Sequence, residues 1–252
     1  MQRYRLTLEY DGGPFVGWQR QGGQLSVQGV LEAAGEALDG GPIEVIGAGR
    51  TDAGVHALGQ VAHLDLRRDL RPEKARAALN AHLRPHPVTV LQAEIVAPGF
   101  HARFDALERS YLYRISNRRA DLVLERGRMW RVPVTLDAEA MDAAAQALVG
   151  RHDFSTFRDS KCQSESPVKS INAISVRRLG EDVELRCSAR SFLHRQVRSI
   201  VGSLVDVGRG KESVGWIAEI LGAADRTLCG PVAPPEGLYL SGVKYDPATS
   251  TP

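Results

Sequence analysis

The chain has 252 residues, of which 43% are hydrophobic and 25% are charged, and its formal net charge is +2. This is enough to bury a substantial core in one large or two compact domains, and the near-neutral charge does not by itself indicate a nucleic-acid-binding protein. Arginine supplies nearly all of the positive charge, which suits contacts with phosphates and bases but is equally expected from a codon bias.

The cysteines and the N-terminus indicate the compartment. Cys162, Cys187 and Cys229 are widely spaced and form no C-x-x-C pair, so neither a disulfide framework nor a zinc site is expected. The N-terminus alternates like a strand and not like a signal peptide, and no apolar run is long enough to span a membrane. We therefore expect a cytoplasmic protein.

The first half of the chain predicts strands and helices in a recognisable order. Residues 4–10 alternate between apolar and polar side chains, which predicts a half-buried strand. Residues 27–38 carry apolar side chains at helical spacing, and Ser26 is a candidate N-cap. Further elements are expected in the order strand, strand, helix and strand, at residues 43–46, 61–66, 72–79 and 88–95. This β-α-β-β-α-β order is that of ferredoxin-like domains.

The second half predicts a similar series. A strand at 110–116 is followed by a helix from Asp137, an acidic N-cap candidate, to Leu148. Two strands joined by a turn at Gly180, a broad apolar helix and a closing strand follow, at 168–177, 183–187, 192–205 and 238–245. We therefore expect the α+β class, with two ferredoxin-like (RRM-like) domains, largely antiparallel sheets and a cleft between them. The expected domains are 1–104 and 105–252.

The most unusual segment is the glycine-rich stretch at residues 47–57, which lies between two predicted strands and reads GAGRTDAGVHA. Glycine permits positive φ angles and the close approach of a ligand, so such a loop can hold the Asp52 carboxylate beside the Arg50 guanidinium. The ordinary alternative is that Asp52 caps a turn and that Arg50 is solvated, and for an isolated aspartate this alternative is favoured.

Several blocks of sequence resemble one family. Residues 49–57 (GRTDAGVHA) resemble the signature of the TruA-type tRNA pseudouridine synthases, and the resemblance extends to about Asp246. Further similar blocks follow the family order, at 10–12 (YDG), 15–19 (FVGWQ), 109–113 (RSYLY), 152–157 (HDFSTF) and 192–198 (FLHRQVR). The chain departs from the common family pattern at Arg190, Ser191 and Gln196.

The resemblance implies a cofactor-independent isomerisation of uridine to pseudouridine. It makes Asp52 the catalytic residue, either as a nucleophile towards the sugar or base or as a base that removes a sugar proton. A guanidinium would keep this carboxylate ionised, and similarity gives that role to Arg198. Tyr111 would lie against the target uracil, and Arg50 would fill the space left by the extruded base. From the residues alone, the ordinary alternatives are favoured, in which Arg198 is a solvated helix flank and Tyr111 is a core strand aromatic.

The resemblance also implies the partners. The targets would be uridines 38–40 in the anticodon stem-loop of tRNA, and a homodimer would bind one tRNA with both subunits. Seven arginines crowd one stretch that we interpret as a phosphate-contact surface, although a mixed surface would also tolerate them: Arg109, Arg114, Arg118, Arg119, Arg126, Arg128 and Arg131.

Other functions are less favoured. A metal site at His56, His63, His82 and His86 is not expected, because no cysteine joins them and prolines flank His86. A non-catalytic RNA-binding protein of RRM-like topology is the main alternative, but the chain has no clear aromatic RRM signature. A small-molecule lyase or hydrolase that uses Asp52 and His56 as an acid–base pair is the third possibility.

Overall fold

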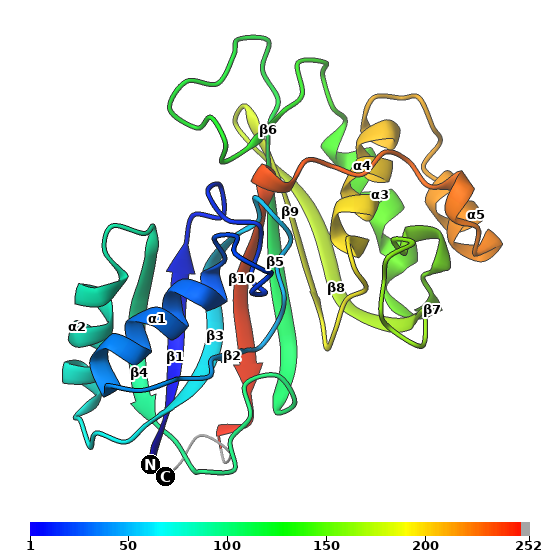
Figure 1. Ribbon diagram of the computed structural model, residues 1–252. Helices are drawn as coiled ribbons and strands as arrows, with labels where there is room; N and C mark the ends of the chain where they lie inside the picture. The colour runs from blue at the N-terminus through cyan, green and yellow to red at the C-terminus, as the bar shows by residue number, and fades with distance from the viewer. Residues whose placement is uncertain (248–252) are drawn as a thin grey trace. The chain divides into compact units, whose positions relative to one another are not determined.

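A computed structural model describes residues 1–247 (Figure 1). Within this range the chain forms two compact units, one of residues 1–109 with 239–247 and the other of residues 110–238. No helix of the described part is long and apolar enough to cross a membrane. Each unit is an α+β structure.

The sheet of the first unit has the order β4-β1-β3-β10. Strand β1 (Gln2–Tyr10) is central and antiparallel to both β3 (His56–Leu66) and β4 (Val88–Ile95). The closing strand β10 (Leu238–Tyr245) runs parallel to β3, with Tyr239 opposite His56. The short β2 (Ile46–Gly47) pairs antiparallel with β3. The even-numbered side chains of β1 from Tyr4 onward are buried, as the alternation predicted.

Two helices cover this sheet, and both begin as their sequences predict. Helix α1 (Val27–Asp39) begins after Ser26, whose side chain accepts a hydrogen bond from the Gly29 amide. Helix α2 (Pro72–Leu83) begins with proline, which lacks the amide hydrogen that a first turn leaves unpaired. In Figure 1 the two helices lie side by side on one face of the sheet.

The second unit has the strand order β5-β9-β8-β7. Strand β5 (Ala106–Ser116) enters it from the first unit and pairs in parallel with the short β6 (Trp130–Arg131). Strands β8 (Val168–Leu179) and β9 (Asp182–Ala189) form an antiparallel hairpin, and β7 (Gly150–Asp153) pairs antiparallel with β8. Three helices complete the unit: α3 (Ala138–Ala145), α4 (Gln196–Gly208) and α5 (Trp216–Ala223).

Short 3-10 helices occur at η1 (Gln146–Leu148), η2 (Ser155–Phe157), η3 (Arg226–Leu228) and η4 (Pro235–Gly237). The predicted helix from Asp137 to Leu148 is therefore an α-helix that ends at Ala145 and continues as η1. Asp137 is its N-cap, as expected, and its side chain accepts a hydrogen bond from the Ala140 amide.

The mixed α+β class and the mostly antiparallel pairing are confirmed, but several details of the sequence prediction are wrong. The strand expected at 43–46 is reduced to β2, because the Val45 carbonyl is bound by the Gln28 side chain and not by a neighbouring strand. The helix expected from Phe192 begins only at Gln196, after Arg195 adopts a left-handed conformation with φ 57°. Strands β6 and β7 and helix α5 were not expected. The division into domains at residue 105 stays a proposal.

Candidate active site

The candidate site is built on the segment of residues 47–56, the Asp52 loop, which joins β2 to β3. Asp52 is half-buried and Arg50 is exposed. Asp52 forms an isolated antiparallel bridge with Gly17, in the loop that follows β1. Gly54 has φ 76°, a conformation that favours glycine. The structure thus places Asp52 in a turn-flanked extended stretch, with its side chain partly open to solvent.

Hydrogen bonds to its own main-chain carbonyls fix the first part of the Asp52 loop. The Arg109 guanidinium donates to the Ala48 carbonyl from Nε at 3.2 Å and from Nη2 at 2.8 Å. Gln60 Nε2 donates to the Gly49 carbonyl at 2.8 Å, and the Trp18 amide donates to the Thr51 carbonyl at 3.0 Å. Several residues before Asp52 are therefore held by groups that are distant in the sequence.

A buried phenol holds the residue next to Asp52. The Tyr10 hydroxyl lies 2.9 Å from Thr51 Oγ1, and Gln60 Nε2 lies 3.5 Å from the same hydroxyl. Burial raises the pKa of Tyr10 to about 12, because desolvation opposes the phenolate more than its two hydrogen bonds favour it. Tyr10 therefore stays protonated near neutral pH and can donate to Thr51.

His56 closes the far end of the loop. Its Nδ1 accepts a hydrogen bond from the Gly12 amide at 3.0 Å and lies 3.2 Å from Asp11 Oδ1. Its ring stacks on Tyr239 at a centroid distance of 4.7 Å. These contacts fix the orientation of the imidazole ring. The contacts describe a residue that supports the loop, and they do not favour the lyase or hydrolase alternative.

The second unit carries the other two expected residues. Tyr111 lies on β5, and its half-buried ring meets Phe192 edge-on at a centroid distance of 5.2 Å. Arg198 lies in the first turn of α4, and its Nε donates to the Ala233 carbonyl at 2.7 Å. The Ala233 amide in turn donates to the Arg198 carbonyl at 3.0 Å. The segment after η3 is thus fixed to the start of α4 at Arg198.

The arginine-rich stretch is only partly exposed. Arg109 is buried and bound to main-chain carbonyls, so its expected place in a phosphate-contact surface is wrong. Three more arginines face carboxylates, in the pairs Arg114–Glu125, Arg118–Glu181 and Arg131–Asp121. The exposed members are Arg119, Arg126 and Arg128.

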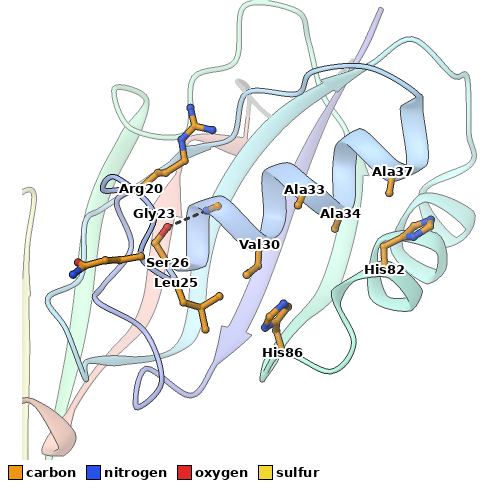
Figure 2. Close-up of a pocket in the computed structure, with 12 residues that line it drawn as sticks. Arg20, Gly23, Leu25, Ser26, Val30, Ala33, Ala34, Ala37, His82 and His86 are labelled. Carbon is orange, nitrogen blue, oxygen red and sulfur yellow. Dashed lines mark hydrogen bonds between the residues drawn. The ribbon is translucent and has the colours of Figure 1, made fainter.

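Other candidate features lie outside the Asp52 loop. A pocket of about 350 Å³ runs along α1 and is also lined by His82 and His86, and no residue of the Asp52 loop lines it (Figure 2). Among residues 1–247, no three or more histidine, cysteine, aspartate or glutamate side chains gather in a way that could hold a metal ion. The Nδ1 of His63 instead accepts a hydrogen bond from the Ala102 amide.

Taken together, the fold and the site define an α+β protein that presents an aspartate and an arginine from a braced, glycine-rich loop. The family model for tRNA pseudouridine synthase matches residues 7–105 and 144–246, and the chain belongs to this family. It is 64% identical to the tRNA pseudouridine synthase A of Maricaulis maris (strain MCS10), over 97% of this chain and 98% of that protein. It is 61% identical to the protein of that name from Hyphomonas neptunium (strain ATCC 15444), over 97% and 99% of the two chains.

The residues that brace the Asp52 loop were not identified from the sequence. Tyr10 fits the alternating pattern of a strand, so nothing in that pattern marks its hydroxyl. The arginine-rich stretch that contains Arg109 predicts an RNA surface and not a support for this loop. Gln60 did offer a signal, because it is a polar residue inside the otherwise apolar run at 57–62. A polar side chain in a buried strand needs a hydrogen-bond partner, and here that partner is the Asp52 loop.

Proposed function

We propose that this protein isomerises uridine to pseudouridine at positions 38–40 in the anticodon stem-loop of tRNA. The observation that carries the proposal is the braced Asp52 loop in a chain that belongs to the tRNA pseudouridine synthase family over most of its length. The names of the similar proteins support a tRNA substrate. The precise positions rest on the sequence resemblance.

The proposed reaction breaks the N1–C1′ bond, turns the uracil and joins C5 to C1′. The C5 hydrogen leaves as a proton and N1 gains one, so no atom is gained overall and no cofactor is needed. Asp52 acts as the nucleophile, towards the sugar or the base, or as the base that takes a sugar proton. Either role needs an ionised carboxylate that reaches the substrate, and the half-buried position of Asp52 suits both.

Three further residues have proposed roles in binding the substrate. Arg50, exposed two residues before Asp52, would enter the space left when the target base leaves the stack. Tyr111 would stack on the uracil, with the edge-on Phe192 ring fixing its orientation. Arg198 would pair with the Asp52 carboxylate, and its Nε bond to Ala233 limits the directions in which its guanidinium can point.

The proposed assembly is a homodimer in which one tRNA contacts both subunits, and the proposed compartment is the cytoplasm. Both follow from the family resemblance, and the wide cysteine spacing agrees with a reducing compartment.

The test is direct. The purified protein is incubated with unmodified tRNA transcripts that carry uridines at 38–40, without added metal or nucleotide, and pseudouridine is located along the RNA. We expect it at these positions, and we expect it to be missing there in tRNA from cells that lack the protein. An RNA-binding protein of RRM-like topology would bind the transcript and form none.

A further inference from the structure

We infer that Tyr10 and Gln60 are positioning residues for the reaction, which fix the main chain that presents Arg50 and Asp52. The inference rests on the proposed function. It assigns a role to two side chains of the sheet that carry no chemistry themselves.

The Asp52 loop is held at two residues next to the ones it presents. Gly49 and Thr51 are bound from the core side, by Gln60 and by Tyr10. Arg50 lies between them and is exposed, and Asp52 follows the buried Thr51 and is half-buried. Because Gly49 and Thr51 are each tied to a buried side chain, the main chain is fixed on both sides of Arg50 and immediately before Asp52.

The holding groups are themselves fixed. Gln60 is 0% exposed and Tyr10 is 2% exposed, and they come from β3 and β1, which pair antiparallel. Gln60 Nε2 donates both to the Gly49 carbonyl and, at 3.5 Å, to the Tyr10 hydroxyl, which leaves that hydroxyl to donate to Thr51 Oγ1. One hydrogen-bonded chain therefore joins two strands of the sheet to two points of the loop.

The loop needs such support because glycine occupies positions 47, 49 and 54. Glycine adds backbone freedom, so the conformation of this loop is set by its contacts and not by its own steric limits. Displacing a catalytic group by about 1 Å can cost about 100-fold in rate. Removing the hydrogen bond between Tyr10 and Thr51 should therefore have a larger effect on the rate of catalysis than on the free energy of unfolding or the affinity for tRNA.

The chain offers a matched pair of substitutions. Tyr10→Phe removes a buried hydroxyl from the Asp52 loop. Tyr4→Phe removes a buried hydroxyl from the same strand, where it accepts from the Leu70 amide and donates to the Leu70 carbonyl at 2.6 Å. Both should lower Tm by a similar amount, about 2–4 °C. Only Tyr10→Phe should lower the single-turnover rate constant, by about 10- to 100-fold. Its Kd for tRNA should stay within about threefold of wild type.

Conservative variants test the partner atoms. Thr51→Ser keeps the hydroxyl and should retain most of the activity, whereas Thr51→Val should match Tyr10→Phe. The double variant Tyr10→Phe/Thr51→Val should be no less active than either single variant, because both substitutions remove the hydrogen bond between the two hydroxyl groups. Gln60→Met, which keeps the length of the side chain and removes its amide, should lower kcat in the same way.

Hydrogen exchange of the peptide covering residues 49–55 gives a reading that does not depend on activity. We expect exchange to be at least about tenfold faster in Tyr10→Phe than in wild type and unchanged in Tyr4→Phe. Unchanged exchange in Tyr10→Phe, or equal kcat in the two phenylalanine variants, would overturn the inference. If the wild-type protein forms no pseudouridine, the proposed function fails instead, and the exchange comparison still decides whether Tyr10 holds this loop.

Discussion

Asp52 and Gly17 form an isolated antiparallel bridge, which ties the loop after β1 to the Asp52 loop. Gly17 has φ 117°, and a Cβ at this position would stand 2.6 Å from the Thr51 carbonyl oxygen. The bridge therefore requires glycine for two reasons, its backbone conformation and the closeness of the opposing chain.

We expect Gly17→Ala to lower the free energy of unfolding by about 1–3 kcal/mol and to reduce activity sharply. Gly23→Ala is the control, since Gly23 also has a positive φ but nothing lies within 4 Å of its added Cβ. Urea unfolding measures the change in stability, and initial rates with tRNA measure the change in activity. Equal reductions of activity in the two variants would show that the bridge at Asp52 is unimportant.

Replacing Asp52 by asparagine separates catalysis from turn capping. Asn and Asp are nearly equal as caps, so a capping residue would tolerate the change. A catalytic carboxylate would not, and we expect activity to fall by several orders of magnitude while folding and tRNA binding survive. The assay is release of tritium from C5 of labelled uridine in tRNA. Asp137→Asn, at the N-cap of α3, should be fully active. Near wild-type release by Asp52→Asn would refute the catalytic role.

Tyr111→Phe and Tyr111→Ala should differ, because stacking needs the ring and not the hydroxyl. We expect alanine to weaken binding of an anticodon arm by about 1–3 kcal/mol and phenylalanine to keep much of it. Tyr113→Phe serves as the control, since the buried Tyr113 hydroxyl donates to the Pro234 carbonyl and its removal should affect only stability. If phenylalanine at 111 binds normally but is as inactive as alanine, the hydroxyl takes part in the chemistry.

Binding of tRNA should weaken steeply with salt, through the exposed arginines of the stretch after β5. Changing Arg118 and Arg119 to alanine should flatten the slope of log K against log salt by about 0.7–0.9 for each phosphate that the variant no longer neutralises. Arg118 faces Glu181 at 4.0 Å, so Arg119 should account for the larger part. The exposed Arg186, paired with Glu184 on β9, provides a control substitution. An unchanged slope would remove the stretch from the RNA surface.

His63 should make stability depend on pH. Burial lowers its pKa from 6.5 to about 4, and nearby Arg3 adds to the shift. As pH falls, the unfolded chain takes up this proton first, so the stability is fully present above about pH 6.5 and is lost towards pH 4. Allowing for solvent screening, the decrease should be about 1–2 kcal/mol.

The comparison is with His63→Asn, whose amide oxygen can still accept from the Ala102 amide but does not titrate in this range. Urea unfolding at a series of pH values should show a smaller decrease in stability for this variant between pH 6.5 and 4. Parallel curves for the two proteins would mean that the buried histidine does not contribute.

Several helix starts and the identity of the Asp52 loop could be predicted from the sequence alone. Ser26 and Asp137 mark helix starts because their side chains bind amides three residues ahead, and Pro72 because it needs no partner for its nitrogen. The residues at 49–57 identified the family because so long a motif is specific. Each of these signals lies in residues that are close together in the sequence.

The distant residues that support the Asp52 loop became known from the three-dimensional structure. The contacts of Arg109 with Ala48 and of Tyr10 with Thr51 join residues 61 and 41 positions apart. The parallel pairing of β10 with β3 likewise brings Tyr239 and Leu240 back to the sheet of the first unit. The residues next to an arginine or tyrosine in the sequence do not indicate such a partner, because the hydrogen bond exists only once the strands have paired. Arg109 was expected to contact phosphates. It is instead buried and supports the main chain before Asp52.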